Sequence, residues 1–345
     1  MRLPVNPADI GRPRDTETLE AAARILRNGG LVAFPTETVY GLGANALDRA
    51  AVERIFAAKQ RPSWDPMIVH VATMEMLDQL VAEIPEAARR LMEAFWPGPL
   101  TLLLPRKATV PDAVTAGRPL VGVRMPSHPV ALEIIRRAGV PVAAPSANRF
   151  AHISPTTAAH VLHDLDGRID AVVDAGATAH GLESTVVDPS TSPMVIYRPG
   201  AITAEQMEQV AGPVQAFSEV EFQSEKGKAL PAPGVGLRHY APHAKLVLIG
   251  APERQLGARL KAAASRRPDE ILGVMLPEGI PAPPGVDAVR VFAWGRWDVP
   301  EELARRLYAG LRELDAAGCT VILCPLPPAR GLGMAIRDRL RKAAR

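Results

Sequence analysis

Small polar residues and arginines stand where apolar segments of this chain end, and together they could bind an anionic ligand. The run "AFPTETVYGLG", residues 33–43, passes from the predicted end of a buried strand into Thr36, Glu37, Thr38 and Tyr40. Later apolar segments are followed in the same way by Arg124, Ser146, Asn148, Ser184, Thr185 and Arg198. Loops at the carboxyl ends of strands are where open α/β sheets bind ligands. We therefore predict one binding site built from these residues.

Lys59 and Arg61 bring positive charge from the end of a predicted helix, which Pro62 terminates. Guanidinium groups bind phosphates and carboxylates bidentately, so the whole set, if it converges on one cleft, suits phosphates and a carboxylate. Each residue also has a simpler explanation. A threonine or serine after a strand is more often a turn or cap residue, Lys59 is typical of a solvated helix end, and His70 is typical of a buried structural histidine.

Composition and known motifs narrow the class of protein. The chain has 345 residues, 47% of them hydrophobic, and a formal net charge of +3, which permits an anionic ligand or RNA without requiring either. Aromatic residues make up 4%, too few for an extended platform that stacks single-stranded nucleic acid. The "GLG" at 41–43 lacks the Lys-Ser/Thr of a Walker A loop, and no G-x-S-x-G or HExxH motif occurs. His160 and His163 are predicted to lie on a helix face rather than in a metal site.

The elements that must position these residues indicate an α/β protein with a large mixed sheet and a smaller Rossmann-like domain after it. A helix is predicted from Asp15 or Thr16 to Gly30, and a second one over 48–59. Further strands of the first domain are predicted at 67–71, 100–104, 120–124, 141–144, 171–174, 184–188 and 194–197, and further helices near 85–95, 128–138, 156–164 and 203–211. We expect a first domain over 1–211, a linker or lid over 212–244 and a second domain over 245–345.

Two features bear on the compartment. Cys319 and Cys324 lie five residues apart on a predicted strand and point to opposite faces, as expected of buried thiols in a reducing compartment. No apolar run approaches the roughly 18 residues of a membrane span, and the first 15 residues lack the apolar core of a signal peptide. We expect a cytoplasmic protein without a membrane partner.

A set of motifs in a fixed order resembles one family along nearly the whole chain. The motifs are "FPTETVYGLGANA", "AAKQRP", "PMIVHV", "WPGPLT", "VRMPSHP", "PVAAPSAN", "GLESTVVD", "RPGAI" and "APGVGLRHYAP". They resemble the two-domain threonylcarbamoyl-AMP synthases, whose first part is a YrdC-like domain. The resemblance implies that L-threonine, bicarbonate and ATP give threonylcarbamoyl-AMP and pyrophosphate. The product would serve the tRNA adenosine beside the anticodon, with a tRNA or a tRNA-modifying transferase as a further partner.

The resemblance also assigns residues. It implies a threonine site made of Thr36 or Thr38 with His70, Arg124, Ala144 and Ser184, in which Arg124 pairs with the substrate carboxylate. It implies an ATP site made of Lys59, Arg61, Asp65, Leu120, Ser146, Asn148, Ser154, Arg198 and Val235, with Lys59 and Arg61 acting on the triphosphate. Magnesium would arrive with ATP, held largely by phosphate oxygens and water.

The linker is expected to close over the nucleotide as a lid. Its glycines at 234 and 236 permit hinge motion, Val235 could meet an adenine face, and Arg238, His239 and Tyr240 could add polar contacts. Leu237 stands where the family usually has an aromatic residue. Two alternatives stay open: a double-stranded RNA binder, and a carbamoyl-AMP-forming maturation enzyme, although the latter class carries cysteine-rich zinc modules that two cysteines cannot supply.

Overall fold

The structure is a computed structural model that describes residues 1–217, 229–236, 239–283 and 289–345. The chain divides into two compact units. The first contains Met1–Phe150, Ser154–Ala179 and Glu183–Gly236, and the second contains Ala151–Ile153, His180–Leu182 and Leu237–Arg345. Residues 218–228, Leu237 and Arg238 of the predicted linker lie outside the described residues.

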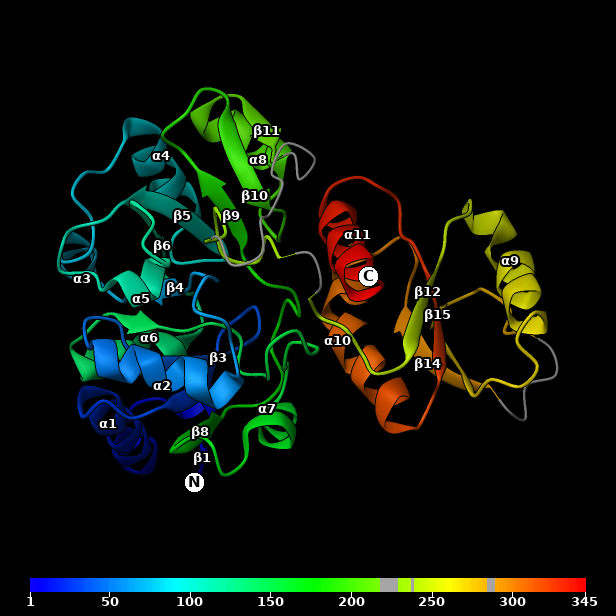
Figure 1. The fold of residues 1–345 in the computed structure, drawn as a ribbon, viewed down its shortest axis with the longest axis horizontal. Helices are drawn as coiled ribbons and strands as arrows, with labels where there is room; N and C mark the ends of the chain where they lie inside the picture. The colour runs from blue at the N-terminus through cyan, green and yellow to red at the C-terminus, as the bar shows by residue number, and fades with distance from the viewer. Residues whose placement is uncertain (218–228, 237–238, 284–288) are drawn as a thin grey trace. The chain divides into compact units, whose positions relative to one another are not determined.

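The first unit is built on an eleven-stranded mixed sheet in the order β1-β8-β2-β3-β7-β4-β6-β5-β9-β10-β11 (Figure 1). Both parallel and antiparallel pairs occur, as the mixed α/β fold class predicted from the sequence requires. The strands are β1 (Arg2–Pro4), β2 (Val32–Pro35), β3 (Tyr40–Asn45), β4 (Ile68–His70), β5 (Leu100–Pro105), β6 (Leu120–Arg124), β7 (Val142–Ala143), β8 (Ala171–Asp174), β9 (Thr185–Asp188), β10 (Met194–Arg198) and β11 (Val214–Ala216).

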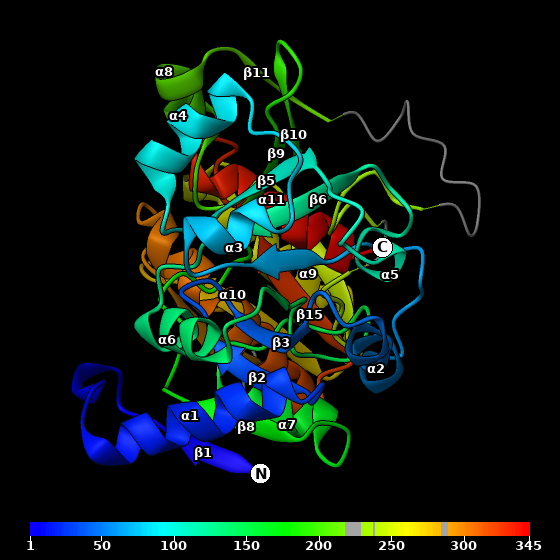
Figure 2. The same ribbon diagram turned by 90° about the vertical axis from the view of Figure 1, so that its left-hand side faces the viewer.

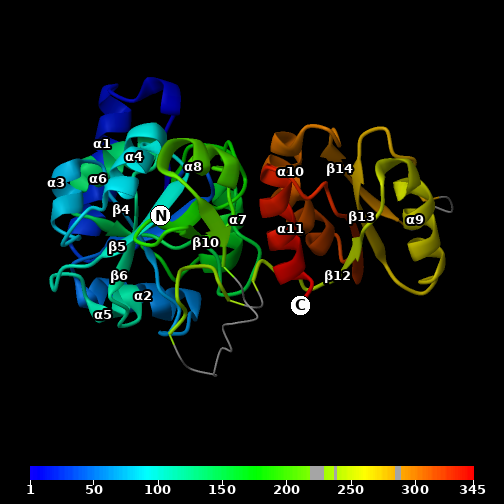
Figure 3. The same ribbon diagram turned by 90° about the horizontal axis from the view of Figure 1, so that it is seen from above.

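Helices cover both faces of this sheet. Helices α1 and α6 lie on one face, and α2 and α5 lie on the other (Figures 2 and 3). The helices are α1 (Pro13–Arg27), α2 (Arg49–Lys59), α3 (Met74–Asp78), α4 (Glu86–Phe95), α5 (Asp112–Thr115), α6 (Pro129–Ala138), α7 (Ala158–Leu165) and α8 (Ala204–Ala211), preceded by a 3-10 turn, η1 (Pro7–Asp9). Aliphatic side chains from the sheet and from these helices form one buried core. The polar residues at the strand ends are exceptions to this apolar interior.

The second unit is a four-stranded parallel sheet in the order β12-β15-β13-β14. Its strands are β12 (Lys245–Ile249), β13 (Leu272–Pro277), β14 (Arg290–Gly295) and β15 (Val321–Pro325), and its helices are α9 (Glu253–Ser265), α10 (Pro300–Ala316) and α11 (Leu332–Ala343). Figure 3 shows α10 and α11 on one face of the sheet and α9 on the other. This alternation of strands and helices is the arrangement that the sequence predicts for a small Rossmann-like domain.

The segment "AFPTETVYGLG" forms a tight hairpin instead of the long loop that its composition suggests. Strands β2 and β3 pair antiparallel, so only residues 36–39 form the turn. Gly43 is required by close packing, because a Cβ there would lie 2.6 Å from Cε1 of Phe34 and 2.9 Å from Cγ1 of Val142. The glycines that suggested a loop therefore belong to a strand that approaches its neighbours closely.

Helix α1 begins differently from the prediction. Neither Asp15 nor Thr16 is its cap, since Arg12 occupies that position without a side-chain hydrogen bond and Pro13 is the first helical residue. Proline suits that position, because its fixed φ is helical and its missing N–H is not needed there. Helix α2 does follow the prediction: the Asp48 carboxylate accepts hydrogen bonds from the N–H groups of Ala50 (2.9 Å) and Ala51 (3.3 Å).

The cysteines and the helices were both subjects of sequence predictions. Both cysteines are buried and free, in agreement with the prediction of buried thiols. Across the described ranges, no helix combines the length and the apolar character needed to cross a bilayer.

We expect Gly43→Ala to destabilise the first unit by about 1–3 kcal/mol, because the added methyl group must displace Phe34 or Val142. Gly122→Ala in β6 is the matched control, since its Cβ would meet nothing closer than 3.4 Å. Urea unfolding of both variants checks this. Equal destabilisation of the two would contradict the packing argument.

Candidate active site

Strand register brings several of the predicted residues to one edge of the sheet. Strand β4 runs parallel to β6, with His70 opposite Arg124. Strand β5 is antiparallel to β6 and parallel to β9, and β10 is antiparallel to β9. The ends of β4, β6 and β10 therefore meet the beginnings of β5 and β9, where His70, Arg124, Ser184 and Arg198 are found.

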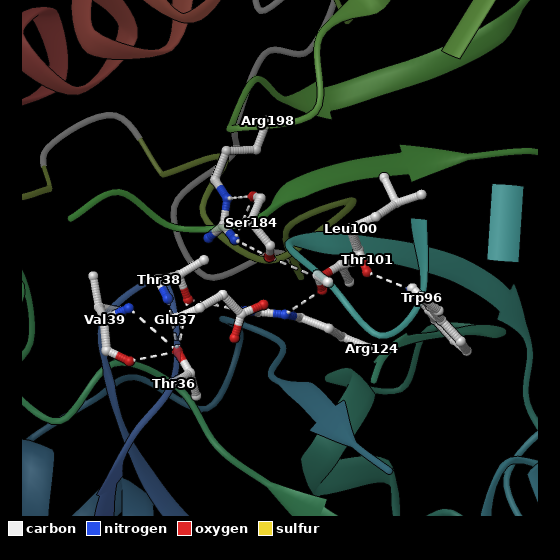
Figure 4. A network of polar contacts seen from close by, with 11 residues as sticks. Thr36, Glu37, Thr38, Val39, Trp96, Leu100, Thr101, Arg124, Ser184 and Arg198 are labelled. Atoms are coloured by element: carbon white, nitrogen blue, oxygen red, sulfur yellow. Dashed lines mark hydrogen bonds and ion pairs between the residues drawn. The ribbon is translucent and has the colours of Figure 1, made fainter. Parts of the chain in front are cut away.

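Arg124 is the centre of the first polar group at this edge. Its guanidinium contacts Glu37 (Nη2 to Oε1, 2.5 Å), donates from Nη1 to Oγ1 of Thr38 (2.9 Å) and donates from Nε to the carbonyl of Gly98 (3.1 Å). Figure 4 shows Glu37 and Arg124 pointing toward each other from the turn and from β6. Thr36 completes the turn by donating to the carbonyl of Val39 (2.7 Å). Thr36 thus shapes the turn, whereas Thr38 contacts the arginine.

The charges in this group are fixed by burial and by Arg124. Burial raises the pKa of Glu37, but the charge of Arg124 and its hydrogen bond outweigh this, so the pKa falls to about 2. Burial lowers the pKa of His70 to about 3, helped by the positive charge of Arg124. His70 is therefore a neutral imidazole at physiological pH. Its Nδ1 is buried and has no hydrogen-bond partner within the described part of the chain, which differs from a fully satisfied structural histidine.

Ser184 is the centre of a second polar group at the same edge (Figure 4). Its hydroxyl lies 2.8 Å from that of Thr101 and accepts a hydrogen bond from Nη2 of Arg198 (3.1 Å). The Arg198 guanidinium also donates twice to the Ser184 carbonyl, at 3.0 and 2.9 Å. All three side chains are buried. Thr185, in contrast, donates away from this group to the carbonyl of Ile202 (2.6 Å).

Lys59 is buried, with 1% of its surface exposed, so the interpretation of it as a solvated helix end is wrong. Its ammonium group donates to the carbonyls of Ser146 and Asn148, each at 2.5 Å. Burial, together with the charge of Arg61, holds the pKa of Lys59 well below its usual value. Lys59 thereby ties the "PSAN" segment to the end of α2.

Arg61 lies beside Lys59 and pairs with a buried carboxylate. Its Nη2 is 3.0 Å from Oδ2 of Asp65, and the same nitrogen donates to the carbonyl of Pro66 (2.7 Å). Burial raises the pKa of Asp65, while the charges of Arg61, Lys59 and Arg198 act in the opposite direction. The effect of Arg198 on Asp65 places this cationic group within electrostatic range of the Ser184 group.

Residues 229–236 of the predicted linker belong to the first unit and pack within it. Val235 is buried in an apolar cluster with Ile68, Leu103, Val186 and Ala232, against which Leu120 also packs. A Cβ at Gly234 would lie 2.8 Å from Nη1 of Arg198, and Gly234 has a φ of +78°. Only glycine therefore lets the linker lie this close to the arginine.

The remaining predicted residues have other contacts, belong to the second unit or lie outside the described residues. Ser154 donates to the buried Glu183 carboxylate at 2.5 Å. Ala144 is buried beside β4, and its backbone N–H donates to the carbonyl of Ile68 (2.9 Å). Of the linker residues, Arg238 lies outside the described residues with Leu237, whereas Tyr240 belongs to the second unit and stacks on Tyr308 at 5.7 Å.

The sequence analysis placed Glu37 in the predicted site but did not predict its partner, and it did not single out Thr101. Thr101 is the one hydroxyl within the apolar run "LTLLL", and this lone polar residue in a buried strand is the only sequence signal for it. The structure buries it completely, but its partner Ser184 follows only from strand pairing. Glu37 lies within the quoted turn, but its pairing with Arg124 depends on how the hairpin meets β6. In the described ranges, no group of three or more His, Cys, Asp or Glu residues could hold a metal ion.

Two family models together match most of the chain. A model described as telomere recombination, which covers Sua5, YciO and YrdC proteins, matches residues 24–200. A model described as the C-terminal domain of threonylcarbamoyl-AMP synthase matches residues 202–345.

Relatives match over the full length. The threonylcarbamoyl-AMP synthase of Bacillus subtilis is 46% identical over 99% of this chain and 96% of its own, and that of Pyrococcus abyssi is 44% identical over 94% of both. A crystal structure of P. abyssi Sua5 complexed with L-threonine has a TM-score of 0.90 and 42% identity, covering 100% of this chain and 97% of that one. These matches fit the threonylcarbamoyl-AMP interpretation and neither the RNA-binding nor the carbamoyl-AMP alternative.

We expect His70 to make the first unit less stable in mild acid. The unfolded chain binds a proton on this residue near its ordinary pKa of about 6.5, whereas the folded chain does not until the pH approaches about 3. Stability should therefore fall as the pH falls, by about 1.4 kcal/mol between pH 7.5 and 5.5 from this residue alone.

Urea unfolding of His70→Asn at the two pH values measures this contribution. We expect the free energy of unfolding to depend less on pH in this variant than in the unchanged protein. His163→Asn, an exposed position on α7, is the control and should keep the full dependence. An unchanged pH dependence in His70→Asn would mean that His70 is protonated in the folded state.

Proposed function

This chain belongs to the threonylcarbamoyl-AMP synthase family, and we propose that it converts L-threonine, bicarbonate and ATP to threonylcarbamoyl-AMP and pyrophosphate. The observation that carries the proposal is the edge of the first sheet, where Arg124 and a neutral His70 lie beside Ser184 and Arg198. Such an edge offers positive charge and hydroxyl groups to two anionic substrates at once.

The reaction needs positioning and charge stabilisation rather than a protein nucleophile. The threonine nitrogen forms a bond to the carbon of carbon dioxide, derived from bicarbonate by loss of hydroxide, and gives up a proton to become a carbamate. A carbamate oxygen then attacks the α-phosphorus of ATP, and the bond between the α-phosphorus and the bridging oxygen breaks to release pyrophosphate. Buried cations and hydroxyls that are already ordered contribute most to such steps.

The Arg124 group is proposed to hold threonine. A guanidinium has five N–H donors, and its contacts with Glu37, Thr38 and Gly98 leave donors for a substrate carboxylate. His70 is neutral and can accept a hydrogen bond from the threonine amine or hydroxyl. Ser184 lies directly before β9 at the same sheet edge, and Ala144 would contribute its backbone groups. Thr36 is proposed to act by shaping the turn that carries Thr38.

ATP is proposed to bind along the cationic groups. Lys59 and Arg61 would meet the triphosphate, and Arg198 would lie between it and Ser184. Ser146, Asn148 and Ser154 supply polar contacts, while Leu120 and Val235 supply an apolar surface for the base. Asp65 already pairs with Arg61, so the nearby protein offers magnesium few oxygens. The ion would therefore enter as part of the Mg·ATP substrate, held by phosphate oxygens and water.

Residues 229–236 are proposed to act as a lid over the nucleotide. They pack on the sheet through Val235 and Ala232, and the Leu230 N–H donates to the carbonyl of Trp64 (3.0 Å). A lid in this position would exclude water from an acyl phosphate that water hydrolyses. The threonylcarbamoyl group would then pass to the tRNA adenosine beside the anticodon, through a partner transferase.

The proposed reaction is tested by mass spectrometry of a mixture of ATP, L-threonine and isotopically labelled bicarbonate. We expect one labelled carbon in threonylcarbamoyl-AMP and one pyrophosphate for each product molecule. Pyrophosphate release that does not depend on threonine, or a product without label, would contradict the proposal.

Arg124→Lys tests the carboxylate clamp. The substitution keeps the charge but replaces the planar fork by an ammonium group, so we expect the KM for threonine to rise by about tenfold or more. The KM for ATP should change little, which separates this role from general damage to the site. A KM for threonine within about twofold of the original would mean that Arg124 only supports Glu37 and Thr38.

Gly234→Ala tests the lid. The new Cβ would collide with the Arg198 guanidinium, so we expect the lid to be displaced and kcat/KM for ATP to fall by about tenfold or more. Gly212→Ala is the matched control, since Gly212 also has a positive φ (+103°) but a Cβ there meets nothing within 4 Å. Threonine-dependent pyrophosphate release measures both variants. Equal activities would argue that the linker is only a tether.

A further inference from the structure

The second unit contains a pocket that the proposed synthesis does not use. Its volume is about 610 Å³, within the range of roughly 300–1,000 Å³ typical of small-molecule sites. All of its lining residues belong to the second unit. They come from the segments that follow β12, β14 and β15 and from the first turns of the helices after them.

The pocket lies at a topological switch point of the parallel sheet. Strands β12 and β15 are neighbours, yet the helices that follow them pack on opposite faces, α9 on one and α11 on the other (Figure 3). Diverging connections of this kind open a crevice beyond the carboxyl ends of the strands, and open α/β sheets bind ligands there. The backbone confirms the location, since Leu326 after β15 donates to the carbonyl of Ile249 at the end of β12 (3.0 Å).

Two arginines give this pocket an anion-binding wall. Arg337 donates from Nη1 to the carbonyl of Pro327 (2.8 Å), while its Nε is buried and has no hydrogen-bond partner among the described residues. Arg330 is exposed beside it. Within the described ranges, no carboxylate forms an ion pair with either arginine, unlike Arg339 on the same helix, which pairs with Asp338 at 2.6 Å. The first turn of α9 also begins here without a side-chain cap.

The rest of the lining suits a ligand with a planar body and hydroxyl groups. Trp297, Pro300 and Leu326 supply apolar surface. Glu253 and Asp298 also line the pocket, and carboxylates there accept hydrogen bonds from hydroxyl or amino groups. A ligand that is only anionic would be repelled by these two carboxylates, whereas one that combines a phosphate with a ribose and a base can satisfy both walls.

We propose that this pocket is a second ligand site, specific for a mononucleotide. The phosphate binds Arg330 and Arg337 near the start of α9, the ribose hydroxyls meet Glu253 or Asp298, and the base lies against Trp297 and the neighbouring prolines. The site is separate from the proposed ATP site, because none of its residues belongs to the first unit.

The test uses the full-length chain with AMP as the probe. Arg198→Ala is introduced first to weaken nucleotide binding in the first unit, and calorimetry then measures AMP binding to the remaining site. Adding Arg330→Ala and Arg337→Ala should weaken that binding by about tenfold or more. Adding Arg266→Ala, an exposed position at the carboxyl end of α9 outside the pocket, should leave it unchanged. Circular dichroism checks that each variant is folded.

Photolabelling with 8-azido-AMP locates the site independently of any substitution. We expect labelled peptides from residues 289–300 or 326–337, with labelling suppressed by excess AMP. Labelling confined to peptides before residue 237, or equal AMP binding in the pocket and control variants, would overturn the proposal. Binding of inorganic phosphate or L-threonine as tightly as AMP would overturn its specificity for a nucleotide.

Discussion

The buried ion pair between Glu37 and Arg124 organises the candidate active site. Removing two charges from water costs several kcal/mol for each ion, and a pair alone rarely recovers that cost. Here the guanidinium also donates to Thr38 and to the Gly98 carbonyl, so the arginine of the pair has further contacts at the sheet edge. The arrangement holds the hairpin turn against β6 and presents the remaining donors of Arg124 in a fixed direction.

A second constraint is that two of the buried basic side chains of the site, Lys59 and Arg198, donate to backbone carbonyls. Lys59 donates to Ser146 and Asn148, and Arg198 donates to Ser184. A carbonyl partner orders a basic side chain without adding an opposite charge at that contact. Contacts of this kind suit the proposed binding of phosphate at the site.

The sequence predicted most of the fold because long periodic segments determine it, as for α2 and α6. It failed where a residue's role depends on a distant neighbour. Strand β3 resembled a loop because its glycines are there for close approach, of which the contact of Gly43 with Phe34 is an example. The positions of Arg124 and Arg198 at strand ends were predictable because each closes an apolar segment. Thr101 was not, since its contact with Ser184 follows only from the pairing of β5 with β9.

The pairing of β1 with β8 has a consequence for how the chain folds. Arg2 lies opposite Val172 and Pro4 opposite Asp174, so the first strand has its sheet partner about 170 residues later in the sequence. Strand β2 also pairs with β8. During synthesis, the amino-terminal edge of the sheet therefore stays open until β8 has left the ribosome. Contacts of such high sequence separation slow folding, so completion of β8 marks the earliest moment at which the first unit can close.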